Sequence, residues 1–252
     1  MKRLYALVLN PSSPYRPHKE VQSPGSSGIY ARRKTTDFYI YSPERRLYKE
    51  QAETIFNATR FFDVIISLVC LILLLPFLVL IAVLIKVTSK GPVVFAQQRV
   101  GKNNEDFRFY KFRTMYVNNA EKNFLTIGER DKRITPVGVF LRRFKLDELP
   151  QLYNVLNNEM SIVGPRPEVR KYVSLYSEAQ KEMLNLKPGI TDYASIAFVN
   201  ESALLAKHQD AEAFYIKEIM PLKIELNRKY AEDKSLRNYF TIILKTFFSI
   251  AS

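Results

Sequence analysis

The residue pair best suited to chemistry is Asp147-Glu148, in the segment RRFKLDELPQLYNVL. Neighbouring carboxylates can supply a nucleophile and a base, and together they can bind a divalent cation. If Asp147 caps the helix predicted directly behind it, free backbone N–H groups and the helix dipole favour its ionised form, as attack requires. An acidic N-cap followed by Glu is also an ordinary helix start, so the pair alone leaves a structural role open.

Basic residues near this pair predict phosphate binding. Arg142 and Lys145 lie just upstream, and Arg166 lies in a Gly-Pro-Arg-Pro loop whose two prolines fix the backbone for bidentate recognition. Lys111 and Arg113, in YKFRTM, are further candidates for phosphate contacts. A surface loop and an exposed strand face would carry the same residues.

Composition limits the chemistry further. Lys and Arg (38) outnumber Asp and Glu (25), and the formal charge of +13 indicates a nucleic acid, an anionic membrane or a phosphorylated substrate as partner. Two histidines and one cysteine argue against a His/Cys metal site or a catalytic triad. With no Walker loop and no GxGxxG, nucleotide binding would need another architecture.

An uncharged run over residues 64–85 has the length of about 20 residues needed to cross a hydrocarbon core. Pro76 lies near its middle, where proline removes a hydrogen bond and kinks a helix. Both flanks are basic, and the positive-inside rule assigns such flanks to the cytoplasm. A helix broken at Pro76 that enters and leaves by one face fits both observations, and a plain span with a tolerated proline also fits.

The remaining segments predict small elements around the candidate residues. Residues 1–50 are rich in Pro, Ser and Gly and predict a weakly structured extension, and residues 51–60 predict a short helix. Strands are predicted at Val93–Phe95 and Phe107–Phe112, with a turn around Gly101–Asn104.

A helix is predicted to begin at Thr135-Pro136, followed by another behind Asp147 and a loop over 161–168. Helical periodicity resumes over 168–185 and 210–230. Aromatic and basic residues then recur at helical spacing from Leu236 to Phe248, which predicts an amphipathic helix that lies in the headgroup region or packs on the core.

Taken together, these segments resemble the bacterial sugar transferase family, the monotopic phosphoglycosyl transferases. The resemblance runs from about Arg60 to the C-terminus and rests on an ordered set of motifs. They are RFFD, SKGPVVFAQQRVG, FYKFRTM, LRRFKLDELPQLYNVLNNEMSIVGPRPE and LKPGIT.

The resemblance implies transfer of a sugar 1-phosphate from a UDP-sugar to polyprenyl phosphate, with release of UMP. It implies Asp147 as the nucleophile of a covalent phosphosugar intermediate, Glu148 as its partner in an acidic dyad that holds Mg²⁺, and Arg142 and Arg166 at the substrate phosphates. It also implies a re-entrant helix that breaks at Pro76, in the bacterial inner membrane with the catalytic domain on the cytoplasmic face. Downstream glycosyltransferases become candidate partners, and nucleic acid does not.

The sequence departs from the family pattern at two places. Leu75 stands where many members have Ser before the breaking proline, and Asp192-Tyr193-Ala194-Ser195 replaces a Gly and a Trp-Gln pair. The alternative function is a membrane-anchored basic scaffold or lipid-binding protein without catalysis.

The predicted fold is α+β and mainly helical, with one re-entrant membrane helix, a small β-hairpin and interfacial amphipathic helices. Its predicted parts are an extension over 1–59, the membrane helix over 60–90 and a catalytic domain over 91–252.

Overall fold

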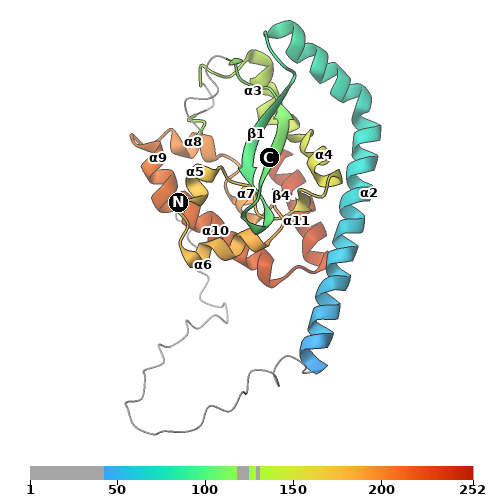
Figure 1. Ribbon diagram of the computed structural model, residues 1–252. Helices are drawn as coiled ribbons and strands as arrows, with labels where there is room; N and C mark the ends of the chain where they lie inside the picture. Colours follow the sequence, from blue (N-terminus) through green and yellow to red (C-terminus); the bar gives the residue numbers. More distant parts are fainter. Residues whose placement is uncertain (1–42, 118–124, 129–130, 252) are drawn as a thin grey trace. The chain divides into compact units, whose positions relative to one another are not determined.

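The computed structural model describes residues 43–117, 125–128 and 131–251 of the chain. The region is mainly helical, with one antiparallel hairpin and one short parallel strand pair (Figure 1). Residues 1–42 of the predicted extension lie outside the described residues, and residues from Ile55 onward form one compact unit. The helices are α2 (Pro43–Thr88), α3 (Pro136–Arg143), α4 (Gln151–Leu156), α5 (Arg170–Val173), α6 (Glu178–Lys181), α7 (Tyr193–Ala197), α8 (Glu201–Leu205), α9 (Ala211–Phe214), α10 (Met220–Glu232) and α11 (Leu236–Ala251). The strands are β1 (Val94–Val100), β2 (Asp106–Phe112), β3 (Ser161–Val163) and β4 (Gly189–Thr191).

The apolar segment is part of α2, which also contains the helix predicted over 51–60. α2 continues through Pro76, so the helix is not interrupted at the predicted kink. Instead the ribbon of α2 changes direction in its teal part (Figure 1). A proline removes one N–H donor and crowds the preceding turn, which bends a helix whose neighbouring turns still hold.

Most side chains of the apolar segment face away from the rest of the unit. Ile72 and Leu73 are 63% and 73% exposed, whereas Ile81 and Ile85 are buried against Phe112 of the hairpin. Among the described residues, Ala58–Thr88 is the one helix long and apolar enough to cross a membrane.

Polar contacts tie both ends of this segment to the same unit. Near its start, Asp63 Oδ1 accepts hydrogen bonds from the Ile162 N–H (2.9 Å) and the Tyr239 hydroxyl (2.8 Å). Near its end, Arg113 Nη2 donates to the carbonyls of Ile85 (3.3 Å) and Ser89 (2.8 Å). Ile85 lies in the last turn of α2, and Ser89 directly follows the helix.

The predicted hairpin is confirmed, with a first strand longer than expected. β1 and β2 pair in register from Val94 opposite Phe112 to Val100 opposite Asp106. Because side chains alternate between the faces of a strand, Phe95, Gln97 and Arg99 lie on one face of β1.

The helix start at Thr135-Pro136 is also confirmed. The Thr135 hydroxyl accepts from the Gly138 N–H at 3.0 Å and caps α3. After α3 the chain turns sharply at Lys145, whose φ of +56° lies in the left-handed region. A 3-10 turn over Leu146–Glu148 follows, and α4 begins only at Gln151.

The loop predicted over 161–168 is only partly correct, because Ser161–Val163 form β3. β3 pairs in parallel with β4, and at its end two glycine backbones approach closely. A Cβ on Gly189 would lie 2.1 Å from the Gly164 nitrogen, so no side chain fits there. Local sequence does not predict this pairing, because β4 lies more than 20 residues away.

The helical predictions near the C-terminus hold in outline. The periodicity over 168–185 corresponds to short helices, including α5 and α6, and that over 210–230 to α9, a π-helical turn and most of α10. In α11, Tyr239 and Ile242 are fully buried in the core. Phe247 and Phe248 are largely exposed, so α11 packs on the core through one face and leaves an apolar face uncovered.

Candidate active site

Asp147 lies at the centre of the 3-10 turn that connects α3 to α4. Its side chain is 7% exposed, and its Oδ1 atom has no hydrogen-bond partner among the residues that the structure describes. The N-cap prediction for Asp147 is wrong, because Pro150 caps α4 and Lys145 precedes the 3-10 turn. The carboxylate is therefore held by its surroundings and not by a helix terminus.

The surroundings of Asp147 favour its protonated form. Burial raises the pKa of this carboxyl to about 6, and the negative charge of Glu148 adds to the rise. Lys111, Arg142 and Lys145 act in the opposite direction. The expectation that a helix terminus would favour the ionised form is wrong, because burial replaces the N-cap as the main influence.

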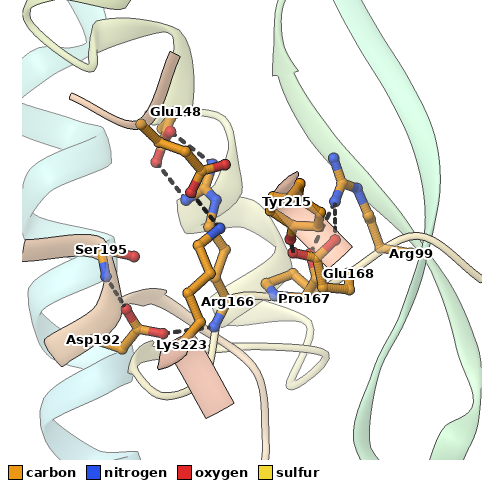
Figure 2. Close-up of polar contacts among 10 residues, drawn as sticks. Arg99, Glu148, Arg166, Pro167, Glu168, Asp192, Ser195, Tyr215 and Lys223 are labelled. Carbon is orange, nitrogen blue, oxygen red and sulfur yellow. Dashed lines mark hydrogen bonds and ion pairs between the residues drawn. The ribbon is translucent and has the colours of Figure 1, made fainter. Parts of the chain in front are cut away.

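Glu148 has the opposite character, because Arg166 holds it with two hydrogen bonds. Nη2 donates to Oε1 at 2.7 Å and Nη1 donates to Oε2 at 3.0 Å (Figure 2). Burial alone would raise the pKa of Glu148, but Arg166 and Lys145 hold it below its ordinary value. The dyad therefore pairs an ionised Glu148 with an Asp147 that titrates near pH 6.

The aromatic ring of Phe109 in β2 lies against the Arg166 guanidinium. The Arg166 Cζ lies 5.8 Å from the ring centroid, and the Cζ of Arg99 lies 5.5 Å from the same ring. Arg99 also donates to the Pro167 carbonyl at 3.1 Å and lies 3.7 Å from a Glu168 oxygen (Figure 2). Sequence reasoning did not select Arg99, although the two-residue alternation of β1 places it on the same face as Phe95.

Lys111 and Arg142 both act electrostatically on Asp147. Lys111 is half-buried and lies over the Phe95 ring, with its Nζ 5.4 Å from the centroid. Burial lowers the pKa of Lys111 to about 8, against the opposing effect of Asp147. Burial also lowers the pKa of Arg142, and the charge of Asp147 is the largest influence that opposes this. Both cations thus lie within electrostatic reach of the Asp147 carboxylate.

Arg113 is the predicted site residue that the structure places elsewhere. Its side chain is 4% exposed and its Nη2 binds the Ile85 and Ser89 carbonyls and the Ser89 hydroxyl (2.7 Å). Successive residues of an extended strand point to opposite faces, so Lys111 and Arg113 would share a face if β2 continued. However, β2 ends at Phe112, so this alternation does not extend to Arg113.

The two carboxylates of the dyad suit a magnesium ion. Among the described residues, no three His, Cys, Asp or Glu side chains form a metal cluster. Mg²⁺ is commonly bound by one or two carboxylates together with substrate phosphates, and Asp147 Oδ1 is a buried oxygen that lacks a donor among the described residues. Asp147 and Glu148 fit this donor set.

Comparison with known sequences identifies the family of the chain. The sequence model described as bacterial sugar transferase matches residues 54–252, most of the chain. The chain belongs to the bacterial sugar transferase family. The match includes most of α2 with the apolar segment, the hairpin, the dyad and the Arg166 loop.

Curated members of the bacterial sugar transferase family resemble the chain over about half of its length. A UDP-glucose:undecaprenyl-phosphate glucose-1-phosphate transferase of Klebsiella pneumoniae is 45% identical over 140 residues, which are 54% of this chain and 30% of that protein. A UDP-N-acetylgalactosamine-undecaprenyl-phosphate N-acetylgalactosaminephosphotransferase of Aeromonas hydrophila is 41% identical over 140 residues, 54% of this chain and 33% of that protein. Exopolysaccharide production protein ExoY of Rhizobium meliloti (strain 1021) is 38% identical over 159 residues, 57% of this chain and 70% of that protein. The chain therefore spans about a third of the length of the first two relatives and more than two thirds of the third.

Proposed function

We propose that this chain transfers a sugar 1-phosphate from a UDP-sugar to polyprenyl phosphate and releases UMP. The observation that carries the proposal is the buried Asp147 carboxylate, surrounded by Lys111, Arg142 and Lys145 and adjacent to the Glu148–Arg166 pair. Family membership and the activities for which the relatives are named support the same reaction class.

The reaction proceeds by two displacements at one phosphorus. An Asp147 oxygen attacks the sugar-bearing phosphorus of the UDP-sugar, and the bond from that phosphorus to the UMP oxygen breaks. An oxygen of polyprenyl phosphate then attacks the same phosphorus, and the bond to Asp147 breaks. The products are UMP and a polyprenyl diphosphate sugar, and Asp147 is regenerated. Because the steps are separate, the two bulky substrates need not be bound together.

The cationic side chains around Asp147 counter the charge of the reactants. UDP-sugar and polyprenyl phosphate are both anions, so their approach to a carboxylate is repulsive unless positive charge lies nearby. Lys111, Arg142 and Arg166 supply such charge in a partly buried site, where it is screened less than at the surface. Asp147 and Glu148 would hold Mg²⁺, which supplies further charge neutralisation when bound.

The contacts at both ends of the apolar segment support a re-entrant arrangement. The basic flanks of the segment and the family membership support the bacterial inner membrane, with the active site at the cytoplasmic face. A straight helix from Asp63 to Ile85 would be about 33 Å long, close to the thickness of a hydrocarbon core. Its ends would then emerge on opposite sides, yet Ile162 and Arg113 hold both ends within one compact unit. A bend in α2 allows both ends to remain on one side.

The test of the activity is UMP release by the full chain in lipid nanodiscs, with a panel of UDP-sugars and undecaprenyl phosphate. We expect turnover with at least one sugar, and less than about 0.1% of it in Asp147→Asn, as for loss of a nucleophile. Asp233→Asn, at an exposed carboxylate that caps a turn, is the matched control and should keep turnover. Absence of UMP release with every sugar would favour the non-catalytic scaffold, and substantial turnover of Asp147→Asn would remove the assigned nucleophile.

The test of the topology is the accessibility of tags at the two termini in intact and in permeabilised cells. We expect both tags to react only after permeabilisation. An N-terminal tag that reacts from outside would establish a full span.

A further inference from the structure

The main chain on either side of the Arg166 side chain is held by two other side chains. Asp192 Oδ2 accepts a hydrogen bond from the Arg166 N–H at 2.9 Å, and Arg99 Nη1 donates to the carbonyl of the next residue, Pro167, at 3.1 Å (Figure 2). Pro165 on the other side accepts from the Gly189 N–H at 3.0 Å. The backbone that carries the Arg166 guanidinium is therefore fixed at three consecutive residues.

Asp192 differs from an ordinary helix cap in that it uses both carboxylate oxygens. Oδ1 accepts from the Ser195 N–H and caps α7, and Oδ2 is the atom that binds Arg166. The side chain is fully buried, with 0% exposure. A cap of so short a helix requires one acceptor, and a serine would supply it. The second oxygen therefore has a separate role.

We propose that Asp192 is a positioning residue, which holds the Arg166 backbone so that its guanidinium makes two hydrogen bonds with Glu148. The inference rests on the proposed function, because it assigns Asp192 to the reaction through Arg166. The carboxylate thus gives the Arg166 loop a support that a side chain without an acceptor would not provide.

Charge acts in the same direction as the hydrogen bond. Burial disfavours the charged form of Arg166, but Glu148 first and then Asp192 and Asp147 hold its pKa above the ordinary value. Loss of the Asp192 carboxylate would remove both a fixed backbone contact and part of this stabilisation. Glu148 would then lose the geometry that keeps both of its oxygens engaged.

Asp192→Ser separates positioning from capping, because its hydroxyl can cap α7 but cannot also reach the Arg166 N–H. The matched control is Asp210→Ser, since Asp210 caps the similarly short α9 by accepting from the Ala213 N–H at 2.9 Å. We expect Asp192→Ser to lower kcat/KM for UMP release about 10- to 100-fold, as for a hydrogen bond that supports a charged group. Asp210→Ser should change it less than about twofold.

A double-mutant cycle tests whether the effect passes through Arg166. In an Arg166→Ala background, Asp192→Ser should lower kcat/KM less than about twofold further. A full additional loss in that background, or an effect of Asp192→Ser no larger than that of Asp210→Ser, would overturn the proposal.

A second readout does not depend on turnover. In protein labelled with ¹⁵N-arginine, the guanidinium protons of Arg166 should exchange with water at least about tenfold faster in Asp192→Ser than in the wild type, and not in Asp210→Ser. Unchanged exchange would refute the positioning role whether or not UMP is released. If exchange is faster in Asp192→Ser but the wild type releases no UMP with any UDP-sugar, the proposed function is refuted and the Asp192–Arg166 coupling stands.

Discussion

Arg166 engages both oxygens of Glu148, at 2.7 and 3.0 Å, while the neighbouring Asp147 leaves one oxygen without a donor among the described residues. The two adjacent carboxylates are thereby made chemically different. Glu148 is held as an anion in a fixed orientation, and Asp147 is kept close to protonation by burial and by the Glu148 charge. Of these two residues, Asp147 is therefore the one with an oxygen available for the proposed attack on phosphorus.

The first prediction concerns the two-point contact. Arg166→Lys keeps the positive charge but replaces a planar fork with a single ammonium, which cannot hold both Glu148 oxygens in the same way. We expect kcat/KM for UMP release to fall about 10- to 100-fold. Arg170→Lys, in an exposed ion pair with Asp106, is the control and should change kcat/KM less than about twofold. Equal effects of the two substitutions would contradict the assigned role.

The second prediction concerns the pH profile of kcat/KM. Asp147 must be ionised to attack, so activity should fall about tenfold per pH unit below its pKa of about 6. Lys111 is cationic below its pKa of about 8, so activity should also decline above that pH. Measurement of UMP release from pH 5 to 9 should therefore give a bell-shaped profile.

Lys111→Arg identifies the alkaline limb of this profile. An arginine stays charged throughout the range, so the decline above pH 8 should move upward or disappear. A decline that persists unchanged in this variant would show that Lys111 does not cause it.

The third prediction concerns stability. The pKa of Asp147 rises from 3.8 to about 6 on folding, so the folded state binds this proton more tightly than the unfolded state. The resulting stabilisation is present below about pH 4 and is lost as the pH rises through 6. Asp147→Asn should consequently be more stable than the wild type by about 3 kcal/mol at pH 8, with no such gain at pH 4. Unfolding in nanodiscs at the two pH values measures this difference, and an equal gain at both would contradict the prediction.

The fourth prediction separates Arg113 from the site cations. Arg113→Met should lower the free energy of unfolding by about 2–4 kcal/mol, because it removes a buried cation that binds the last turn of α2. The folded fraction should keep its KM for UDP-sugar within about twofold. Arg142→Met should do the reverse, with KM raised about tenfold and stability changed by less than about 1 kcal/mol. Thermal unfolding and initial rates on the same preparations distinguish the two.

The parts of the fold that sequence predicts well are those specified by neighbouring residues. Thr135 and Pro136 define a helix start within one turn, and alternation over residues 94–112 defines the hairpin. The dyad and the Arg166 loop are likewise recognisable because each lies within one continuous motif. Pro76 indicates a bend locally, although it does not indicate that the helix continues.

The features that the sequence does not predict correctly depend on contacts between residues far apart in the chain. Ser161–Val163 become a strand only because β4 pairs with them, and Arg113 becomes a structural residue only because Ser89 lies beside it. The pKa of Asp147 depends on its burial, which no N-cap pattern reports. The proposed role of Asp192 depends on the hydrogen bond between its second oxygen and the Arg166 N–H, which are far apart in the sequence.

The double attachment of α2 also has a practical consequence for making a water-soluble form of this protein. Removal of residues before Ser89 would strip the acceptor from the Ile162 N–H and from the Tyr239 hydroxyl, and would expose the apolar surface on which Ile81 and Ile85 pack. The remainder would be a domain with an exposed apolar surface and not a complete smaller protein. A soluble variant should therefore carry substitutions at the outward-facing side chains of this helix, such as Ile72 and Leu73. Its buried side chains, such as Ile81 and Ile85, should remain unchanged.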